Sequence, residues 1–220
     1  MGIAYNTSIV TNGLVYTLDF ANSRCYSGSG NTVFQLSATG SSATLENGPT
    51  YSTSNGGSLI FDGSNDRIAL PVASLLYGTG SKTLTAWAKL TANTGSWQMI
   101  FGYGTANTNA AFFIGVYGLS SLFGGFATDL QSTSVSLNTW FNITGTYDGS
   151  TANLYVNGVL GLSAARGWNT VQSGQAYIGA QIGPQQYWTG SISECRLYNR
   201  ALTQQEISQN FNATRDRYGI

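Results

Sequence analysis

The chain has 220 residues, of which only 8% are charged, and its formal net charge is zero. This balance argues against a nucleic-acid partner, because a protein that displaces counterions from phosphates needs a basic surface. The apolar content of 42% argues against disorder, and no apolar run approaches the about 20 residues that a membrane helix needs.

Residues 1–12 carry little pattern, and we expect an arm that lies on the domain or on a neighbour. Their start lacks the charged region and apolar core of a signal peptide, so we expect no secretion signal. Alternating apolar and polar residues then predict a strand over 13–20. The same pattern predicts strands over residues 33–36, 43–45, 58–62, 67–70, 82–91, 97–103, 111–117 and 122–127.

The clearest hairpins lie between Trp140 and Leu160. Asp148-Gly149 and Asn157-Gly158 interrupt the alternation there, and such pairs suit tight turns because they tolerate positive φ. Strands over 177–182 and 191–198 complete the series. A meander of this kind predicts an antiparallel all-β protein.

One helix is predicted near the end of the chain. Thr203 and Glu206 have the spacing of a capping box, in which each side chain bonds to the other's backbone amide. Ile207 and Phe211 then share one helical face, so the helix should pack by that stripe. We expect it to end near Asn212 and to be followed by a tail over 213–220.

Three blocks follow one another in the sequence. They are residues 58–71 with FDG, residues 140–160 with YDG and LYVNG, and residues 177–211 with LYNRAL. In this order and spacing they resemble the laminin-G-like, concanavalin A-like lectin and glucanase jelly-roll domains. The resemblance implies a sandwich of two antiparallel sheets over residues 13–212, with one short C-terminal helix and the first strand beside the last.

The ends of the chain carry a further likeness. The opening LDxxNS, from Leu18 to Ser23, and the closing RYGI, from Arg217, resemble the versions of this domain found in bacteriophage virion proteins. That likeness implies a non-enzymatic capsid decoration protein or a tail or fibre component, located in the virion and assembled in the host cytoplasm. Its partners would be other virion proteins or further copies of itself.

A carbohydrate-binding module is the alternative, and it is compatible with a virion role if the protein holds cell-surface glycans weakly. A glycoside hydrolase is the least favoured function. The chain has no His, and none of Glu46, Glu194 and Glu206 has another carboxylate two or four residues away, as a retaining pair on one strand would need. An inverting pair from separate strands stays open.

The candidate sugar-binding residues are aromatic rings and an amide in loop-like contexts, because rings stack on sugars and amides orient their hydroxyl groups. They are Trp97, Tyr103, Trp168, Gln186, Tyr187 and Trp188. The same rings would equally serve to plug the ends of a sandwich or to form subunit contacts.

No cofactor is expected. Asp62 and Asp66 flank GSN and resemble a crude calcium loop, although turn formation explains both residues as well. Without a secretion signal, we expect Cys25 and Cys195 to be free thiols rather than a disulfide.

Overall fold

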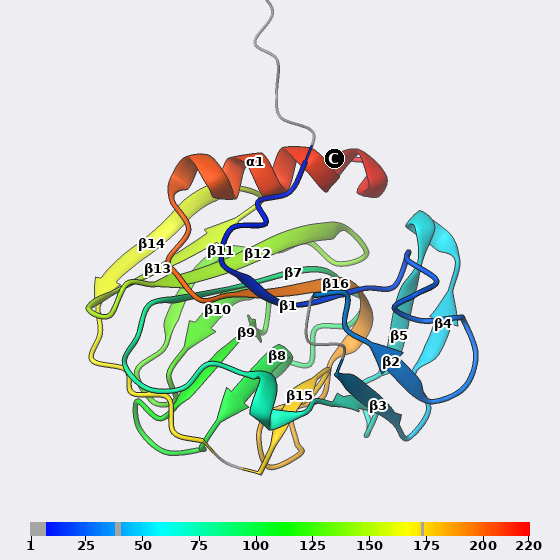
Figure 1. Ribbon diagram of the computed structural model, residues 1–220, viewed down its shortest axis with the longest axis horizontal. Helices are drawn as coiled ribbons and strands as arrows, with labels where there is room; N and C mark the ends of the chain where they lie inside the picture. Colours follow the sequence, from blue (N-terminus) through cyan, green and yellow to red (C-terminus); the bar gives the residue numbers. More distant parts are fainter. Residues whose placement is uncertain (1–7, 38–40, 173) are drawn as a thin grey trace, which may run out of the picture.

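The computed structural model describes residues 8–37, 41–172 and 174–220. These residues form two antiparallel sheets packed face to face, with one α-helix on the outer face of one sheet (Figure 1). The predicted all-β jelly-roll sandwich with a short C-terminal helix is therefore confirmed. Within the described ranges, no helix is long and apolar enough to cross a membrane.

Sheet A contains both the first and the last strand of the chain. Its strands, in spatial order, are β14 (Val159–Ala165), β13 (Thr151–Val156), β12 (Trp140–Tyr147), β7 (Lys82–Leu90), β16 (Thr189–Tyr198), β5 (Ser58–Asp62) and β4 (Thr50–Ser52), and β1 (Leu14–Asp19) also pairs with β16. Tyr16 of β1 lies opposite Leu197 of β16, so the expected pairing of the first strand with the last is confirmed.

Sheet B forms the second layer. Its strands, in spatial order, are β11 (Leu130–Ser134), β10 (Ser120–Gly124), β9 (Ala111–Tyr117), β8 (Trp97–Gly104), β15 (Ala176–Ile178), β6 (Arg67–Ala69), β3 (Ser42–Glu46) and β2 (Thr32–Phe34). Two short 3-10 turns, η1 (Ser54–Gly56) and η2 (Val72–Ser74), lie in the connections.

Several strand ends differ from the prediction, and backbone conformation explains two of them. The strand expected over 122–127 stops at Gly124, since Phe126 and Ala127 both have positive φ. The strand expected over 177–182 stops at Ile178, just before Gly179 with φ of 83°. Strands β4, β11 and β14 were not predicted from the alternation.

The core lies between the sheets and is built by the inward face of each strand. Leu84 and Ala86 of β7 point into it, whereas Trp87 points to the outer face, as the alternation predicts. Gly145 of β12 is needed for this packing, because a Cβ at that position would lie 2.4 Å from the ring of Phe123 in the facing sheet. Such contact across the layers is how two sheets share one interior.

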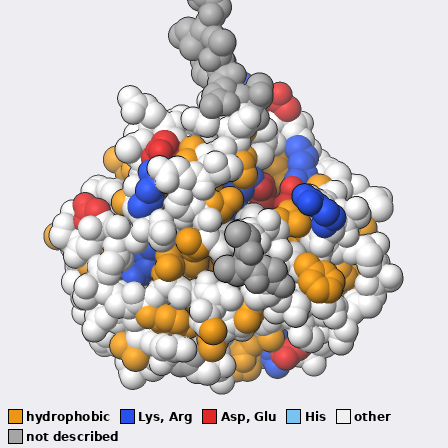
Figure 2. Space-filling model, in the orientation of Figure 1, with side chains coloured by type: hydrophobic (Ala, Val, Ile, Leu, Met, Phe, Trp, Pro, Cys, Tyr) orange, Lys and Arg blue, Asp and Glu red, His pale blue; other side chains and the backbone are white. Residues whose placement is uncertain are grey.

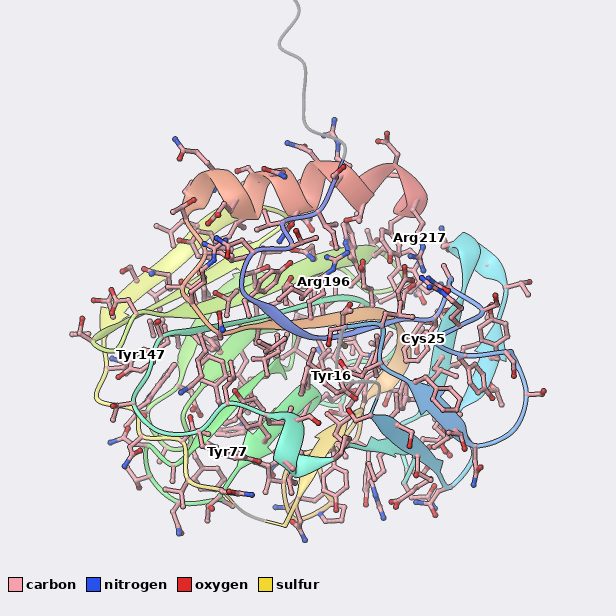
Figure 3. The ribbon with its side chains drawn as sticks, viewed as in Figure 1. Tyr16, Cys25, Tyr77, Tyr147, Arg196 and Arg217 are labelled. Atoms are coloured by element: carbon pink, nitrogen blue, oxygen red, sulfur yellow. The ribbon has the colours of Figure 1, made fainter. Side chains whose placement is uncertain are left out.

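Both cysteines are buried free thiols, as expected from the sequence. Cys25 lies in the interior near Tyr16, and Cys195 is on β16 (Figure 3). Burial raises the pKa of Cys25 to about 12 and raises that of Cys195 as well. Both groups are therefore protonated at neutral pH and are poor nucleophiles.

The C-terminal segment is part of the fold rather than a tail. Helix α1 (Gln204–Thr214) begins with the predicted capping box and continues into a 3-10 turn, η3 (Arg215–Tyr218). The ring of Trp87 on β7 stacks on Tyr218 at 4.0 Å and on Phe211 at 5.7 Å. The expectation of a separate tail over 213–220 is corrected here, because this ring stacking holds η3 on sheet A.

The described part of the expected N-terminal arm also lies on its own domain. The backbone amide of Val10 donates to Asn210 of α1 at 2.8 Å, and Gln209 donates to the carbonyl of Ser8. Tyr198 of β16 donates to the carbonyl of Val10 at 3.0 Å. Residues 1–7 of the arm lie outside the described residues.

Arg217 fixes the C-terminal end against three other segments, which are β1, η1 with its C-cap, and β16. Its guanidinium pairs with Asp19 of β1 at 2.8 Å and donates to the carbonyl of Asn55 in η1 at 2.6 Å. It also donates to the carbonyl of Gly57 and to the hydroxyl of Ser193 on β16. Figure 3 shows Arg217 at the far end of α1, where these segments meet.

We expect Arg217→Met to lower the free energy of unfolding by about 1–3 kcal/mol, because it leaves a half-buried carboxylate and several carbonyls without their donor. Arg215→Met is the matched control, since Arg215 is exposed and its carboxylate partner Asp216 is almost fully exposed. The control should change the stability by less than about 0.5 kcal/mol. Urea unfolding measures both, and equal effects would contradict the account of Arg217.

Candidate functional site

Three of the aromatic candidates are inside the protein. Tyr103, Trp168 and Trp188 are each fully buried. Tyr103 packs against Tyr77 and Phe101 in the core, and its own strand, β8, is central in sheet B. The prediction that these three rings stack on a sugar is therefore wrong, because none of them has a face open to a ligand. They serve the packing role that the sequence left open.

Trp168 closes one end of the sandwich. Its indole donates to the hydroxyl of Thr128 at 2.8 Å, and its ring meets Phe123 edge-on at 4.8 Å. Tyr147 lies 5.4 Å from the same ring and donates to the backbone carbonyl of Trp168. This segment has no secondary structure, so strand periodicity could not reveal that the ring points inward.

A buried cation sits beside these rings. Lys82 is 1% exposed, and its ammonium group lies 5.2 Å above Phe112 and 5.8 Å above Tyr147. It donates to the carbonyls of Gly78 and Gly80, at 2.8 Å and 3.3 Å. No ion pair of the described residues includes it. Burial therefore lowers the pKa of Lys82 to about 8.

The outer face of sheet B offers an open pair of rings instead. Trp97 begins β8 and lies opposite Tyr117, which ends β9. The two rings meet edge to face, with centroids 5.9 Å apart. Trp97 is half-buried and Tyr117 is 42% exposed, so both are accessible. Trp97 is one of the residues predicted from the sequence, whereas Tyr117 is not, and its place opposite Trp97 is what identifies it.

The loop over 179–188 runs next to this pair. It is closed by a hydrogen bond from the amide of Trp188 to the carbonyl of Gly179, and the carbonyl of Gln186 accepts from the amide of Met99 on β8 at 3.2 Å. Gln186 and Tyr187 are half-buried. The left-handed φ of 53° at Gln186 accompanies the turn of the loop towards β8.

Some polar side-chain atoms of this loop have hydrogen-bond partners within the protein, and one does not. Tyr187 donates to the carbonyl of Pro184, and Gln185, which is exposed, donates to Gln181 at 3.1 Å. The side-chain oxygen of Gln186 is buried and has no hydrogen-bond partner among the described residues. A buried acceptor without a donor costs stability, and this oxygen is not itself open to a ligand.

We define the aromatic–amide surface by the three rings and two amides that β8, β9 and this loop contribute. They are Trp97, Tyr117, Gln185, Gln186 and Tyr187. The part of sheet B next to them is rigid, because Met99, Phe113, Leu122 and Ile182 form a buried apolar cluster on the outer face, against which Trp97 packs. Residues 90–128 and 167–193 contain no charged side chain.

Charged groups are sparse elsewhere too. On the face of the molecule in Figure 2, the acidic and basic side chains are few and lie mostly beside one another in small groups of both signs, and white polar side chains and backbone cover most of the surface. Because the segments that form the aromatic–amide surface contain no charged residue, this surface favours a neutral polar ligand over an ionic one.

The proposed calcium residues are occupied by turn hydrogen bonds. The carboxylate of Asp62 accepts from the amides of Ser64 at 2.8 Å and Asn65 at 3.4 Å, and these bonds lower its pKa. Asp66 is buried, accepts from the amide of Asp62 at 3.0 Å, and has its pKa raised by burial. In the described ranges, no three acidic or Cys side chains gather as a metal site would require. A calcium site here stays a prediction.

We expect calcium to leave the melting temperature unchanged within about 1 °C, because both carboxylates already accept backbone amides. Thermal melts with millimolar calcium and with a chelator measure this. A rise with calcium that Asp62→Asn abolishes would show that the turn binds the ion after all.

We expect Lys82→Met to be more stable than the wild type at about pH 7, because the native protein holds an unpaired buried cation there. The unfolded chain keeps this proton up to the ordinary lysine pKa of 10.5, whereas the folded protein releases it near 8. Wild-type stability should therefore gain on the variant as the pH rises from about 8 to 10. Denaturant unfolding at several pH values tests this, and a constant difference would contradict it.

Comparisons with known proteins agree with this architecture. The family model Laminin_G_3, described as concanavalin A-like lectin/glucanases superfamily, matches residues 62–208. No curated protein matches the chain significantly. Domain 4 of AbnA, an extracellular GH43 arabinanase from Geobacillus stearothermophilus solved with arabinotriose, is similar at 16% identity with a TM-score of 0.68, over 90% of this chain and 97% of that one.

Two longer proteins are similar over part of their length. The binding domain of Paraclostridial Mosquitocidal Protein 1 has 16% identity and a TM-score of 0.72, over 91% of this chain and 52% of that one. Trypanosoma rangeli sialidase has 17% identity and a TM-score of 0.72, over 96% of this chain and 34% of that one. At these identities the likeness shows the fold. Since the family model covers well over half of the sequence, the chain belongs to the laminin-G-like family of the concanavalin A-like lectin/glucanases superfamily.

Proposed function

We propose that the protein is a non-catalytic glycan-binding module that holds neutral saccharides on its aromatic–amide surface. The observation that carries this proposal is the accessible Trp97–Tyr117 pair beside an amide-rich loop in a region without charge. A sugar offers an apolar face of C–H groups and a rim of hydroxyl groups. The rings suit the first, and the exposed amide of Gln185 suits the second.

The lack of charged residues around the aromatic–amide surface also indicates which class of glycan it binds. Sialic acids and uronic acids carry a carboxylate, and their recognition normally uses Arg or Lys. Residues 90–128 and 167–193, which supply all five residues of the surface, contain neither. We therefore expect neutral oligosaccharides to bind in preference to acidic ones. The arabinanase domain that shares this fold was solved with arabinotriose, which makes arabino-oligosaccharides a suitable first probe.

The carboxylates support a non-catalytic role. Glu46 pairs with Arg67, and Glu194 pairs with Arg196 in the interior. Glu206 pairs with Arg200 and caps α1, and this lowers its pKa to about 2. Each Glu is thus held by an Arg, whereas a glycosidase acid must be protonated at its working pH.

A virion role is the finer prediction from the sequence, and it is compatible with glycan binding. It is supported by the likeness of the two chain ends to virion proteins and by the neutral surface. The closing RYGI does not supply a free arm, because Arg217 and Tyr218 are used inside the fold. The aromatic–amide surface and other faces would then make the contacts with virion proteins.

We expect Tyr117→Ala to weaken the binding of a neutral oligosaccharide by about tenfold, since an exposed stacking ring contributes roughly 1–2 kcal/mol. A glycan array that includes arabino-oligosaccharides selects the ligand, and calorimetry gives the affinities. Phe34→Ala on β2 is the matched control, because Phe34 is 50% exposed on the same sheet but lies outside the aromatic–amide surface.

The control should bind like the wild type. A wild-type protein that binds no neutral glycan would contradict the proposed function. Binding that survives Tyr117→Ala but is lost in Phe34→Ala would place the site elsewhere on sheet B.

A further inference from the structure

The two sheets have five strands that pair with a neighbour on one side only. β4 and β2 have three residues each, β11 has five and β1 has six, whereas β14 has seven. β14 is therefore the longest strand that is hydrogen-bonded on one side only. An edge of this length presents a row of backbone donors and acceptors to another strand.

β14 also exposes apolar side chains. Val159 is 68% exposed, Leu160 46% and Leu162 38%. Of the seven residues in the strand, only Ala164 is half-buried and the others are exposed. β14 pairs with β13 and contacts β11, but neither strand covers these aliphatic side chains. Burying them against a partner would be favourable by about 25 cal/mol per Å² of apolar surface.

β14 has one of the usual protections of a sheet edge, a β-bulge at Gly161, but it lacks the others. Natural edge strands carry Lys, other charges or Pro, or they are short or covered. Residues 149–165 contain no charged residue and no Pro. The register shift between β13 and β14 falls between Leu160 and Leu162, so residues 162–165 keep an uninterrupted ladder.

We propose that β14 is an interface at which a second copy of this chain docks, with the two β14 strands paired antiparallel across a two-fold axis. A two-fold contact sets the same surface against itself, so any charge on the strand would meet a like charge or need a partner close by. β14 has none, and the neighbouring β11 (LQSTS) has none either. The strand is thus self-compatible.

The same arrangement explains why assembly stops at two copies. β14 is the longest edge strand of each chain, and pairing consumes it in both copies. The opposite edge of sheet A, β4, has only three residues and offers little length for a further copy. The pairing joins the two A sheets into one continuous sheet, and it leaves both aromatic–amide surfaces on sheet B. It does not depend on the proposed glycan function.

Light scattering coupled to size-exclusion chromatography tests the interface between about 5 and 200 µM protein, a range in which micromolar self-association is visible. We expect the wild type to reach the mass of a dimer. Leu162→Lys should remain a monomer, because Leu162 is the central residue of β14 and a two-fold axis there sets the two cations close together. Val171→Lys is the matched control, since Val171 is 46% exposed in a loop outside the sheets, and it should dimerise like the wild type.

Hydrogen exchange gives a second measurement that needs no variant. We expect amides in 159–165 to exchange more slowly at high than at low wild-type concentration. A wild type that stays monomeric throughout overturns the proposal, as does a dimer that Leu162→Lys does not weaken. Growth beyond a dimer overturns the two-fold closure.

Discussion

The pairing of β16 with its neighbours is the interaction on which the rest of the structure depends. β16 pairs along its length with β7 on one side, and on the other side it pairs with β5 at its start and with β1 at its end. The end of β16 leads to α1 and η3, which Arg217 ties back to β1. At its start, the amide of Thr189 donates to Gln98 of β8 at 2.9 Å. One strand therefore positions both the C-terminal segment and the loop that contributes to the candidate site.

The tryptophan residues lie in different places in the fold, and these places decide whether a ring can contact a ligand. Trp87 and Trp140 lie on the helix side of sheet A, where their indoles donate to Thr214 and to Asn55. Trp168 and Trp188 are buried. Rings placed in these positions stabilise the sandwich and cannot hold a ligand. The Trp97–Tyr117 pair remains accessible, and its neighbourhood lacks charge, so function and packing use the same residue type in different places.

The sequence predicted the sandwich because strand alternation, Asn-Gly and Asp-Gly turns and the capping box are local signals. Asn157 and Gly158 both have positive φ, as that turn requires. β14 was missed because VLGLSAA has no polar face to alternate with, and its exposure follows from its place at the edge of sheet A. The direction of Trp188 was not predictable either, since an irregular loop has no period. Tyr117 was missed because pairing across strands cannot be inferred from one strand.

The central claim is that neutral glycans bind where the accessible rings lie. The NMR signals of the five tryptophan indole N–H groups test it most directly, because four of these residues are buried and only Trp97 is half-exposed. On titration with a neutral oligosaccharide, we predict that the Trp97 indole signal moves and the other four stay in place. Movement of a buried tryptophan signal with Trp97 unchanged, or no movement at all, would contradict the account.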